Sequence, residues 1–325
     1  MLGVLHGFGV IAIIIAIGYL LGRLRILSEE MARGLNNICF WIATPSLLFD
    51  TLIKADLKSV FSVHLSVAVF ANAVTSLLFI LISYLWLKRK PAELVIGGLA
   101  AGYVNSANLG IPIALYVIHD TTAFVPILLF QTILLCPLTL SLLDYLVLDH
   151  SEQKTWERLL QPLKNPMVIF GLAGLIFALG HWTPPTIVSE PLHLIGQTAV
   201  PCGLLGFGHS FYGVKVMEKG ITPRRDVALA VTLKSVVMPF IAWLFGRFAL
   251  HLDPQTLFAV CVCAALPTAV NVYIFATRYN TARYLARDAG FLSDTRHPYY
   301  FCSPLTHVKS VSPHNTYKKS PPPMY

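Results

Sequence analysis

Long apolar stretches recur along most of the chain, and each is bounded by polar or charged residues. A helix of roughly 20 apolar residues crosses the ~30 Å hydrocarbon core of a bilayer, so runs of this length indicate membrane spans. The predicted spans lie at about residues 4–22, 36–53, 60–87, 92–118, 123–148, 166–182, 191–213, 226–250 and 256–277. We therefore expect an all-α polytopic membrane protein with the lipid bilayer as its main environment.

The composition excludes a large soluble domain. Hydrophobic residues make up 55% of the 325 residues and charged residues only 12%, which is too apolar for a soluble protein of this size. The formal net charge is +8, a value that also occurs in nucleic-acid-binding proteins. Because the lysines and arginines are scattered over short loops, they indicate membrane topology instead, and no nucleic-acid partner is expected.

The basic residues are divided unevenly between alternate loops. With the N-terminus outside, the outer loops hold only Lys54 and Lys58. The inner loops then hold the basic residues within 23–33, 88–90, 154–164, 215–225 and 278–287. Since cytoplasmic loops are enriched in lysine and arginine, this asymmetry predicts that the N-terminus lies outside.

The two halves of the membrane region resemble each other. The stretch TPSLLF (44–49) has a counterpart in VPCGLLGF (200–207), and both GYVNSANLGIP (102–112) and AALPTAVN (264–271) interrupt an apolar helix. Five spans per half is an odd number, so a second copy would insert with inverted topology, a recurring transporter plan. The predicted units are a first repeat at 1–148, a cytoplasmic connector at 149–165, an incomplete second repeat at 166–293 and a polar tail at 294–325.

The interrupted helices predict a binding site. A proline removes a helical hydrogen bond and frees backbone groups that lipid cannot satisfy, so such breaks belong against protein or a wet cavity. Asn105, Asn108 and Asn271 supply donors and acceptors at the two breaks. The N-terminal ends of the half-helices carry partial positive charge, which favours an anionic substrate.

At these residues the sequence resembles the auxin efflux carrier family of bacterial permeases, relatives of the plant PIN carriers and of the bile acid:sodium symporter-like fold. The resemblance covers about residues 1–293 and rests on NICFWIATPSLLF, NSANLGIPIAL, NPMVIFGLAGL, LKSVVMP and AALPTAVNVYIFATRY followed by ARDAG. It implies a ten-helix inverted repeat in the inner membrane, with broken crossover helices four and nine. Helices one, two, six and seven would form a scaffold, and the other six would form a moving transport unit.

The resemblance also implies a substrate class and a set of site residues. Family members carry small carboxylates such as malate, malonate or auxin. The substrate site transferred from this pattern consists of Asn105, Asn108, Gly110, Pro112, Gln131, Pro267 and Asn271. Two alternatives stay open, because prolines can be simple kinks and membrane asparagines often join helices by hydrogen bonds.

Lys234 is a further candidate because it lies some eight residues inside the eighth predicted span. An ionisable group at that depth is costly and usually functional, which predicts a role in proton or anion coupling. The alternative is that the long side chain extends back to the cytoplasmic surface.

The C-terminal end departs from the family pattern. After ARDAGFLS the chain reads DTRHPYYFCSPLTHVKSVSPHNTYKKSPPPMY, which contains no apolar run of membrane length. We expect that the tenth helix is missing, that a frameshift near Ser293 is the cause, and that 294–325 form a disordered cytoplasmic tail.

These features predict a secondary transporter of a small organic anion that works by alternating access. Two alternatives are an inactive remnant that has lost its tenth helix and a sensor that binds the same ligand without moving it. An enzyme is not expected, because no H-E-x-x-H, G-x-S-x-G or G-x-x-x-x-G-K motif occurs. We expect no cofactor and no metal, and the sequence leaves a homodimer open.

Overall fold

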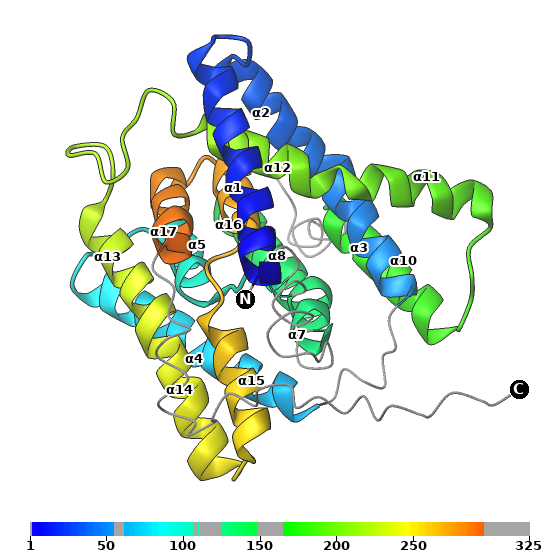
Figure 1. Cartoon of the computed structure of the whole chain (residues 1–325), viewed down its shortest axis with the longest axis vertical. Helices are drawn as coiled ribbons and strands as arrows, with labels where there is room; N and C mark the ends of the chain where they lie inside the picture. The colour runs from blue at the N-terminus through cyan, green and yellow to red at the C-terminus, as the bar shows by residue number, and fades with distance from the viewer. Residues whose placement is uncertain (1, 55–61, 107–109, 111–124, 148–164, 296–325) are drawn as a thin grey trace, which may run out of the picture.

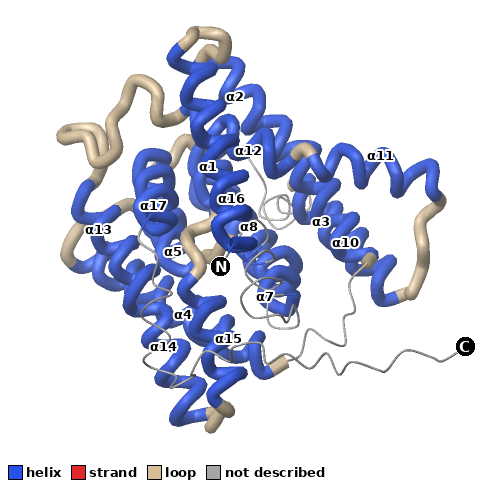
Figure 2. The backbone as a smooth tube through the Cα atoms, viewed as in Figure 1, coloured by secondary structure: helices blue, strands red, loops and turns tan. Residues whose placement is uncertain are grey.

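The computed structural model describes residues 2–54, 62–106, 110, 125–147 and 165–295, and every named element within them is helical (Figures 1 and 2). The first-half elements are α1 (Leu2–Arg23), α2 (Glu29–Ile38), η1 (Cys39–Ala43), α3 (Thr44–Ile53), α4 (Val63–Leu85), α5 (Pro91–Gly102), α7 (Val125–Phe130), η5 (Gln131–Leu135) and α8 (Cys136–Val147). The second-half elements are α10 (Pro166–Leu179), α11 (Thr186–Gln197), α12 (Ala199–His209), α13 (Arg224–Thr232), η7 (Leu233–Val237), α14 (Met238–Leu244), η8 (Phe245–Ala249), α15 (Pro254–Ala265), α16 (Val270–Arg278) and α17 (Arg283–Thr295).

Several helices begin where a capping residue precedes a proline. Asn165 accepts a hydrogen bond from the Met167 N–H just before Pro166, and Asp253 accepts bonds from two N–H groups at the start of α15. A proline in the first helical turn has no N–H to leave unsatisfied, and its fixed φ angle suits a helix start. These local signals set the N-terminal ends of α10 and α15.

The outer surfaces of the long helices are apolar. Helices Val63–Leu87 and Arg224–Ala249 are each long and apolar enough to cross a bilayer. On the first of them Leu77 and Trp86 are 63% and 79% exposed, as side chains that face lipid would be. Shorter apolar helices occur at Gly9–Arg23, Pro91–Gly102, Cys136–Val147, Pro166–Leu179 and Pro254–Ala265. The structure confirms the predicted all-α membrane class.

Equivalent helices of the two halves form equivalent pairs. Helix α1 packs along α12, and α10 packs along α3, which is the arrangement expected if helices one and two repeat as six and seven. Glycines allow the first pair to come close, because a Cβ at Gly18 would overlap the Leu205 carbonyl oxygen and one at Gly208 would overlap that of Ile15. Small residues of this kind permit close backbone approach between membrane helices.

Replacing Gly18 with alanine is expected to lower the free energy of unfolding by about 1–3 kcal/mol, because the added methyl group overpacks the α1–α12 interface. Thermal unfolding of the purified protein in detergent would measure the change. Gly9→Ala is the matched control on the same helix, since a Cβ there meets no atom within 4 Å. Equal melting temperatures for the two variants would contradict this packing.

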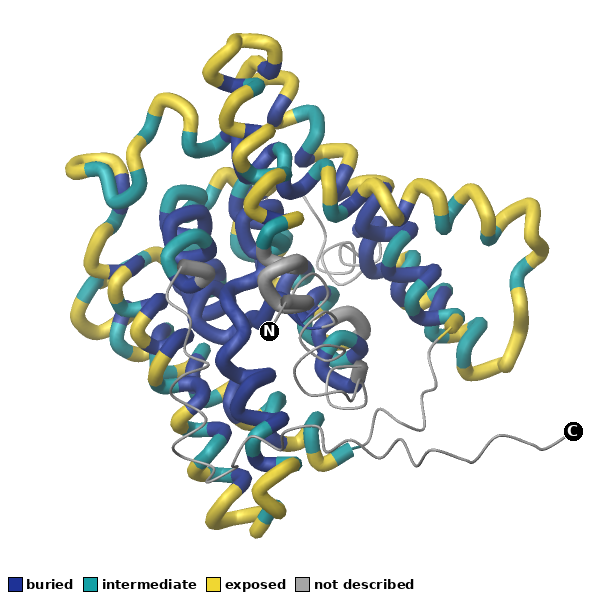
Figure 3. The backbone as a smooth tube through the Cα atoms, in the orientation of Figure 1, coloured by how far each residue is buried: buried dark blue, intermediate teal, exposed yellow. Residues whose placement is uncertain are grey.

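The remaining helices form a second group. Helix α4 packs against α5 and α14, and α17 packs against α13 and α16. At the end predicted to be cytoplasmic, Arg89 of the loop between α4 and α5 donates from Nε and Nη2 to the Asp226 carboxylate of α13 at 2.9 and 2.7 Å. This hydrogen bonding raises the pKa of Arg89. Buried backbone is concentrated where α5, α15, α16 and α17 meet, whereas α11 is largely exposed (Figure 3).

The tenth helical position is partly occupied. Helix α17 starts at Arg283 and brings Ser293 to the backbone of Thr268, whose N–H donates to Ser293 Oγ at 3.0 Å. The chain therefore forms a helix up to the point where its sequence leaves the family pattern. The predicted absence of helix ten and the predicted tail concern residues that lie almost entirely outside the described ranges, and the predicted domain boundaries also stay predictions.

Candidate functional site

The two predicted helix breaks meet in space. Helix α5 ends at Gly102 and α15 ends at Ala265, and the segments that follow run antiparallel, with one isolated bridge between Val104 and Thr268. The Asn105 N–H donates to the Pro267 carbonyl at 2.9 Å, and the Ala269 N–H donates to the Tyr103 carbonyl at 3.1 Å. Each interrupted backbone thus provides hydrogen-bond partners for the other where neither can form helical bonds.

Side chains from neighbouring helices satisfy further backbone groups at the crossing. Asn72 of α4 donates from Nδ2 to the Gly102 carbonyl at 2.8 Å. Gln131 of η5 donates from Nε2 to the Val104 carbonyl at 3.0 Å and accepts from Ser106 Oγ at 2.6 Å. These bonds satisfy backbone carbonyls that the helix breaks leave free, as a break inside the membrane requires.

Thr268 connects the crossing to both flanking helices. Its Oγ1 donates to the Ala100 carbonyl of α5 at 2.6 Å, and its N–H donates to Ser293 of α17. Thr268 is only 3% exposed. Helices four, nine and ten of the predicted repeat are thus fixed to one another at this residue.

Lys234 lies behind the crossing, inside the group formed by α4, α5, α13 to α15 and α17. Its side chain is fully buried, and Nζ donates to the Ala264 carbonyl at 2.8 Å and lies 3.1 Å from Met238 Sδ. Ala264 is in the last turn of α15, where helix carbonyls lack partners and carry partial negative charge. The ammonium group compensates that charge, and the alternative of extension to the cytoplasmic surface is wrong.

A cavity of about 230 Å³ lies between the crossing and helices α3 and α12. Its wall on the crossing side includes Tyr103, Asn105, Ser106, Gln131, Ala269, Val270 and Asn271, and its opposite wall includes Thr44, Leu47, Leu48, Thr51, Ala199, Val200 and Gly203. Tyr103 and Asn271 are joined by a side-chain hydrogen bond. Both side chains are therefore held at the cavity wall.

The first turn of α16 contributes the main electrostatic feature of this cavity. Ala269, Val270 and Asn271 form part of the wall, and the N-cap Ala269 provides no side-chain hydrogen bond to the turn. The N-terminal N–H groups of a helix attract anions. Among the described residues that line the cavity, none is charged, so the helix end and neutral polar side chains would bind an anion here.

The predicted site residues have four different outcomes. Asn105, Gln131 and Asn271 line the cavity, so the structure brings these three together. Gly110 and Pro267 belong to the crossing backbone, where the Gly110 N–H donates to the Asn105 carbonyl at 3.1 Å. Asn108 and Pro112 lie outside the described residues. Lys234 is absent from the lining, and its predicted coupling role stays a prediction.

Sequence reasoning missed several lining residues. Thr44 and Thr51 are seven residues apart, which places them on the same helical face about two turns from each other, in and beside the recognised TPSLLF stretch. That spacing could have identified them as polar positions facing inward. Tyr103 and Ser106 lie within the recognised break itself, but their side chains were not distinguished from structural ones.

Comparison with known proteins gives a family and several relatives. A family profile described as "Membrane transport protein" matches residues 8–293. "Uncharacterized transporter YfdV" of Escherichia coli K12 is 24% identical over 277 residues, which cover 83% of this chain and 86% of the relative. "Putative malonate transporter" of Rhizobium meliloti is 23% identical, covering 82% and 83%. An "Uncharacterized transporter" of Methanothermobacter thermautotrophicus is 27% identical over 71% of this chain and 74% of its own.

Proposed function

Because this chain belongs to the membrane transport protein family, as its resemblance to the auxin efflux carriers predicted, we propose that it is a secondary transporter of a small organic anion. The substrate would bind in the cavity at the crossing and reach each side of the membrane by alternating access. The chain is a membrane transport protein and not an enzyme. The proposal concerns its substrate, its binding site and its mechanism.

The observation that carries this proposal is the cavity between the crossing and the opposite helices. It joins the N-terminal end of α16 to the amide groups of Asn105, Gln131 and Asn271. A carboxylate would accept hydrogen bonds from the first N–H groups of α16 and from these amides. Broken helices with their N-terminal ends directed at an anion are a recurring substrate site in transporters.

The size of the cavity favours a short substrate. Pockets for drug-sized ligands usually measure about 300–1,000 Å³, and this cavity of about 230 Å³ is smaller. A dicarboxylate of three or four carbons would fit, and the name of the Rhizobium meliloti relative supports malonate as the first compound to test. A larger aromatic carboxylate would require the cavity to widen.

The position of the cavity also supports a mechanism. One wall comes from α3 and α12, and the other comes from the crossing and α16. A displacement of the second helix group against the first would open the cavity to one side and then to the other, as in transporters built from inverted repeats. We place this chain in the bacterial inner membrane with its N-terminus outside, following the distribution of basic loops.

Malonate counterflow tests the proposed function. The purified protein would be reconstituted into liposomes loaded with unlabelled malonate, and entry of radiolabelled malonate would be followed. We expect transient accumulation that saturates with malonate and is not supported by malonamide, the neutral analogue. Accumulation no greater than in protein-free liposomes, for malonate, malate and succinate alike, would contradict the proposal.

A further inference from the structure

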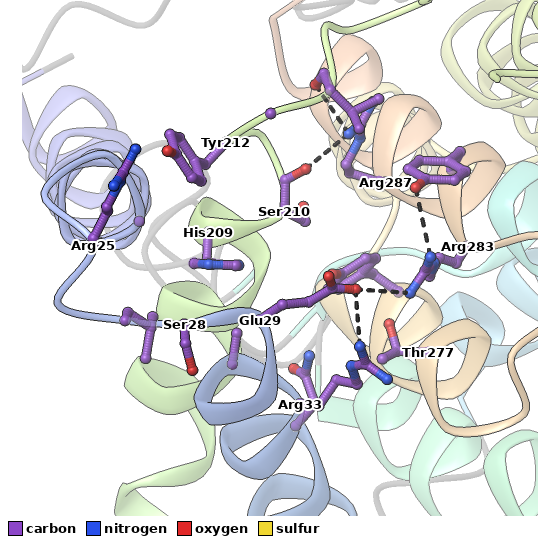
Figure 4. Close-up of a pocket in the computed structure, with 18 residues that line it drawn as sticks. Arg25, Ser28, Glu29, Arg33, His209, Ser210, Tyr212, Thr277, Arg283 and Arg287 are labelled. Atoms are coloured by element: carbon purple, nitrogen blue, oxygen red, sulfur yellow. Dashed lines mark hydrogen bonds and ion pairs between the residues drawn. The ribbon is translucent and has the colours of Figure 1, made fainter. Parts of the chain in front are cut away.

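A second and larger cavity lies at the end of the molecule that is predicted to be cytoplasmic. It measures about 580 Å³ and is bounded by α1, α2 and α12 on one side and by α16 and α17 on the other. We call it the arginine vestibule, because Arg25, Arg33, Arg283 and Arg287 are among the residues that line it (Figure 4). Of the predicted site residues that the structure describes, none lines this cavity.

One of the four arginines has a structural role. Arg287 is fully buried, bonds to the Asp288 carboxylate at 2.6 Å, and donates from Nη1 to the Ser210 carbonyl at 2.8 Å. It also donates to the Val214 and Lys215 carbonyls. Its guanidinium therefore holds the loop after α12, and its charge is compensated by Asp288.

The other three arginines leave an excess of positive charge. Among the described residues that line the arginine vestibule, Glu29 is the only acidic one, against Arg25, Arg33 and Arg283. Arg25 forms no ion pair with any described residue. Ser28 and Glu29 also place the N-terminal end of α2 in the wall, which adds partial positive charge. The vestibule would attract an anion.

The Glu29 carboxylate shows where an anion can bind. Its Oε1 lies 3.2 Å from Arg33 Nη2 and 3.9 Å from Arg283 Nη1 (Figure 4). Glu29 and Arg33 belong to α2, which packs against α12 of the first helix group, whereas Arg283 belongs to α17 of the second. A carboxylate is thus already held between two guanidinium groups from opposite walls. The side chain of Glu29 is 63% exposed, so it can move aside without burying its charge.

The deeper wall supplies a further polar contact. Asn36 is 5% exposed, lines the vestibule, and its Oδ1 has no hydrogen-bond partner among the described residues. Buried polar atoms of this kind normally have a partner. A ligand that carries a hydroxyl or a protonated carboxyl group could donate to this oxygen.

We propose that the arginine vestibule is a second binding site for a small carboxylate, in which Glu29 takes the place of the ligand between Arg33 and Arg283. An incoming carboxylate replaces Glu29 and so breaks the direct ion pair between the two helix groups. The site is separate from the cavity at the crossing, and its existence does not depend on transport.

Equilibrium binding of radiolabelled malonate to the purified full-length protein in neutral-lipid nanodiscs tests this site. In the Asn271→Ala background, in which the crossing site is expected to be impaired, saturable malonate binding should remain. Glu29→Gln should then tighten binding about threefold to tenfold, because the competing carboxylate is gone. Arg33→Gln and Arg283→Gln should each weaken binding about tenfold or more, and Arg283→Lys should lie between.

Matched controls and competing ligands separate the outcomes. Glu30→Gln on α2 and Arg225→Gln on α13 change charges that do not line the vestibule, and they should leave binding unchanged. Unchanged or weaker binding in Glu29→Gln, or full binding in Arg283→Gln, would overturn the proposal. So would stronger competition by inorganic phosphate or by nanodiscs containing phosphatidylglycerol than by malonate, since the arginines would then bind phosphate groups. If counterflow fails while this binding pattern is intact, the proposed transport function is contradicted and the proposed second site is not.

Discussion

Replacing Asn271 with alanine is expected to reduce malonate counterflow to the level of protein-free liposomes while the protein still inserts and unfolds at nearly the same temperature. Asn271 lies in the first turn of α16, lines the cavity at the crossing and is hydrogen-bonded to Tyr103. Alanine removes an amide donor for the carboxylate, while the Tyr103 hydroxyl still lines the cavity, where water can replace the lost bond. A hydrogen bond to a charged group contributes about 1.5–3 kcal/mol, so its loss should weaken malonate binding about tenfold to a hundredfold.

Asn37→Ala is the matched control for this substitution. Asn37 is exposed on α2 and lines neither cavity, so its loss should leave counterflow unchanged. Melting temperatures of the two variants distinguish a lost contact from a lost fold. Counterflow by Asn271→Ala at more than about half the unsubstituted rate would remove this residue from the substrate site.

Replacing Lys234 with methionine is expected to abolish counterflow with only a small change in the free energy of unfolding. Methionine leaves the Ala264 carbonyl without its charged donor, and a lost bond of this kind costs about 1.5–3 kcal/mol. The substitution also removes a fully buried charge, whose desolvation costs several kcal/mol. The two effects offset each other in stability, whereas the C-terminal end of α15 loses the positive charge that fixes it beside the crossing.

Counterflow and thermal unfolding should therefore respond differently in Lys234→Met. Lys219→Met is the control, because Lys219 is an exposed loop residue that lines neither cavity. Lys234→Arg keeps the charge but adds volume in a fully buried position, so we expect partial activity at most. Full counterflow by Lys234→Met would show that the ammonium group serves packing alone.

The fold was predictable because apolar runs, proline breaks and basic loops can each be recognised within a short stretch of sequence. The break near Asn105 and the break near Pro267 were identified from the residues, and the structure brings their backbones within hydrogen-bonding distance. The antiparallel bridge between Val104 and Thr268 was not predictable, because it joins segments more than 160 residues apart. Only the inverted repeat suggested that the two breaks would meet.

The candidate site was predictable in part for a similar reason. Asn105, Gln131 and Asn271 lie in the breaks or face them, and their side chains stand out in apolar sequence. Thr44 and Thr51 come from a helix in the other group, and a short hydroxyl in a membrane helix gives a weak signal because it can bond to its own backbone. Thr51 does so, with its Oγ1 donating to the Leu47 carbonyl at 2.7 Å.

The arginine vestibule was not predicted at all. Its arginines were interpreted as topological signals, because the enrichment of basic residues in cytoplasmic loops explains them without a ligand. Only the contacts of Glu29 with Arg33 and Arg283 distinguish a binding arrangement from a distribution of loop charges. The spacing of these residues along the chain contains no such information.

The proposal that the carried anion binds at the crossing is tested most directly by a distance between the ligand and the site. Solid-state NMR on the reconstituted protein, with ¹³C-carboxyl malonate and ¹⁵N-labelled asparagine side chains, can measure dipolar coupling to the Asn271 amide. Hydrogen-bond geometry predicts a carbon–nitrogen distance of about 4 Å, with the coupling lost in Asn271→Ala and retained in Glu29→Gln. If malonate binds but shows no coupling that disappears in Asn271→Ala, the proposed substrate site at the crossing is contradicted.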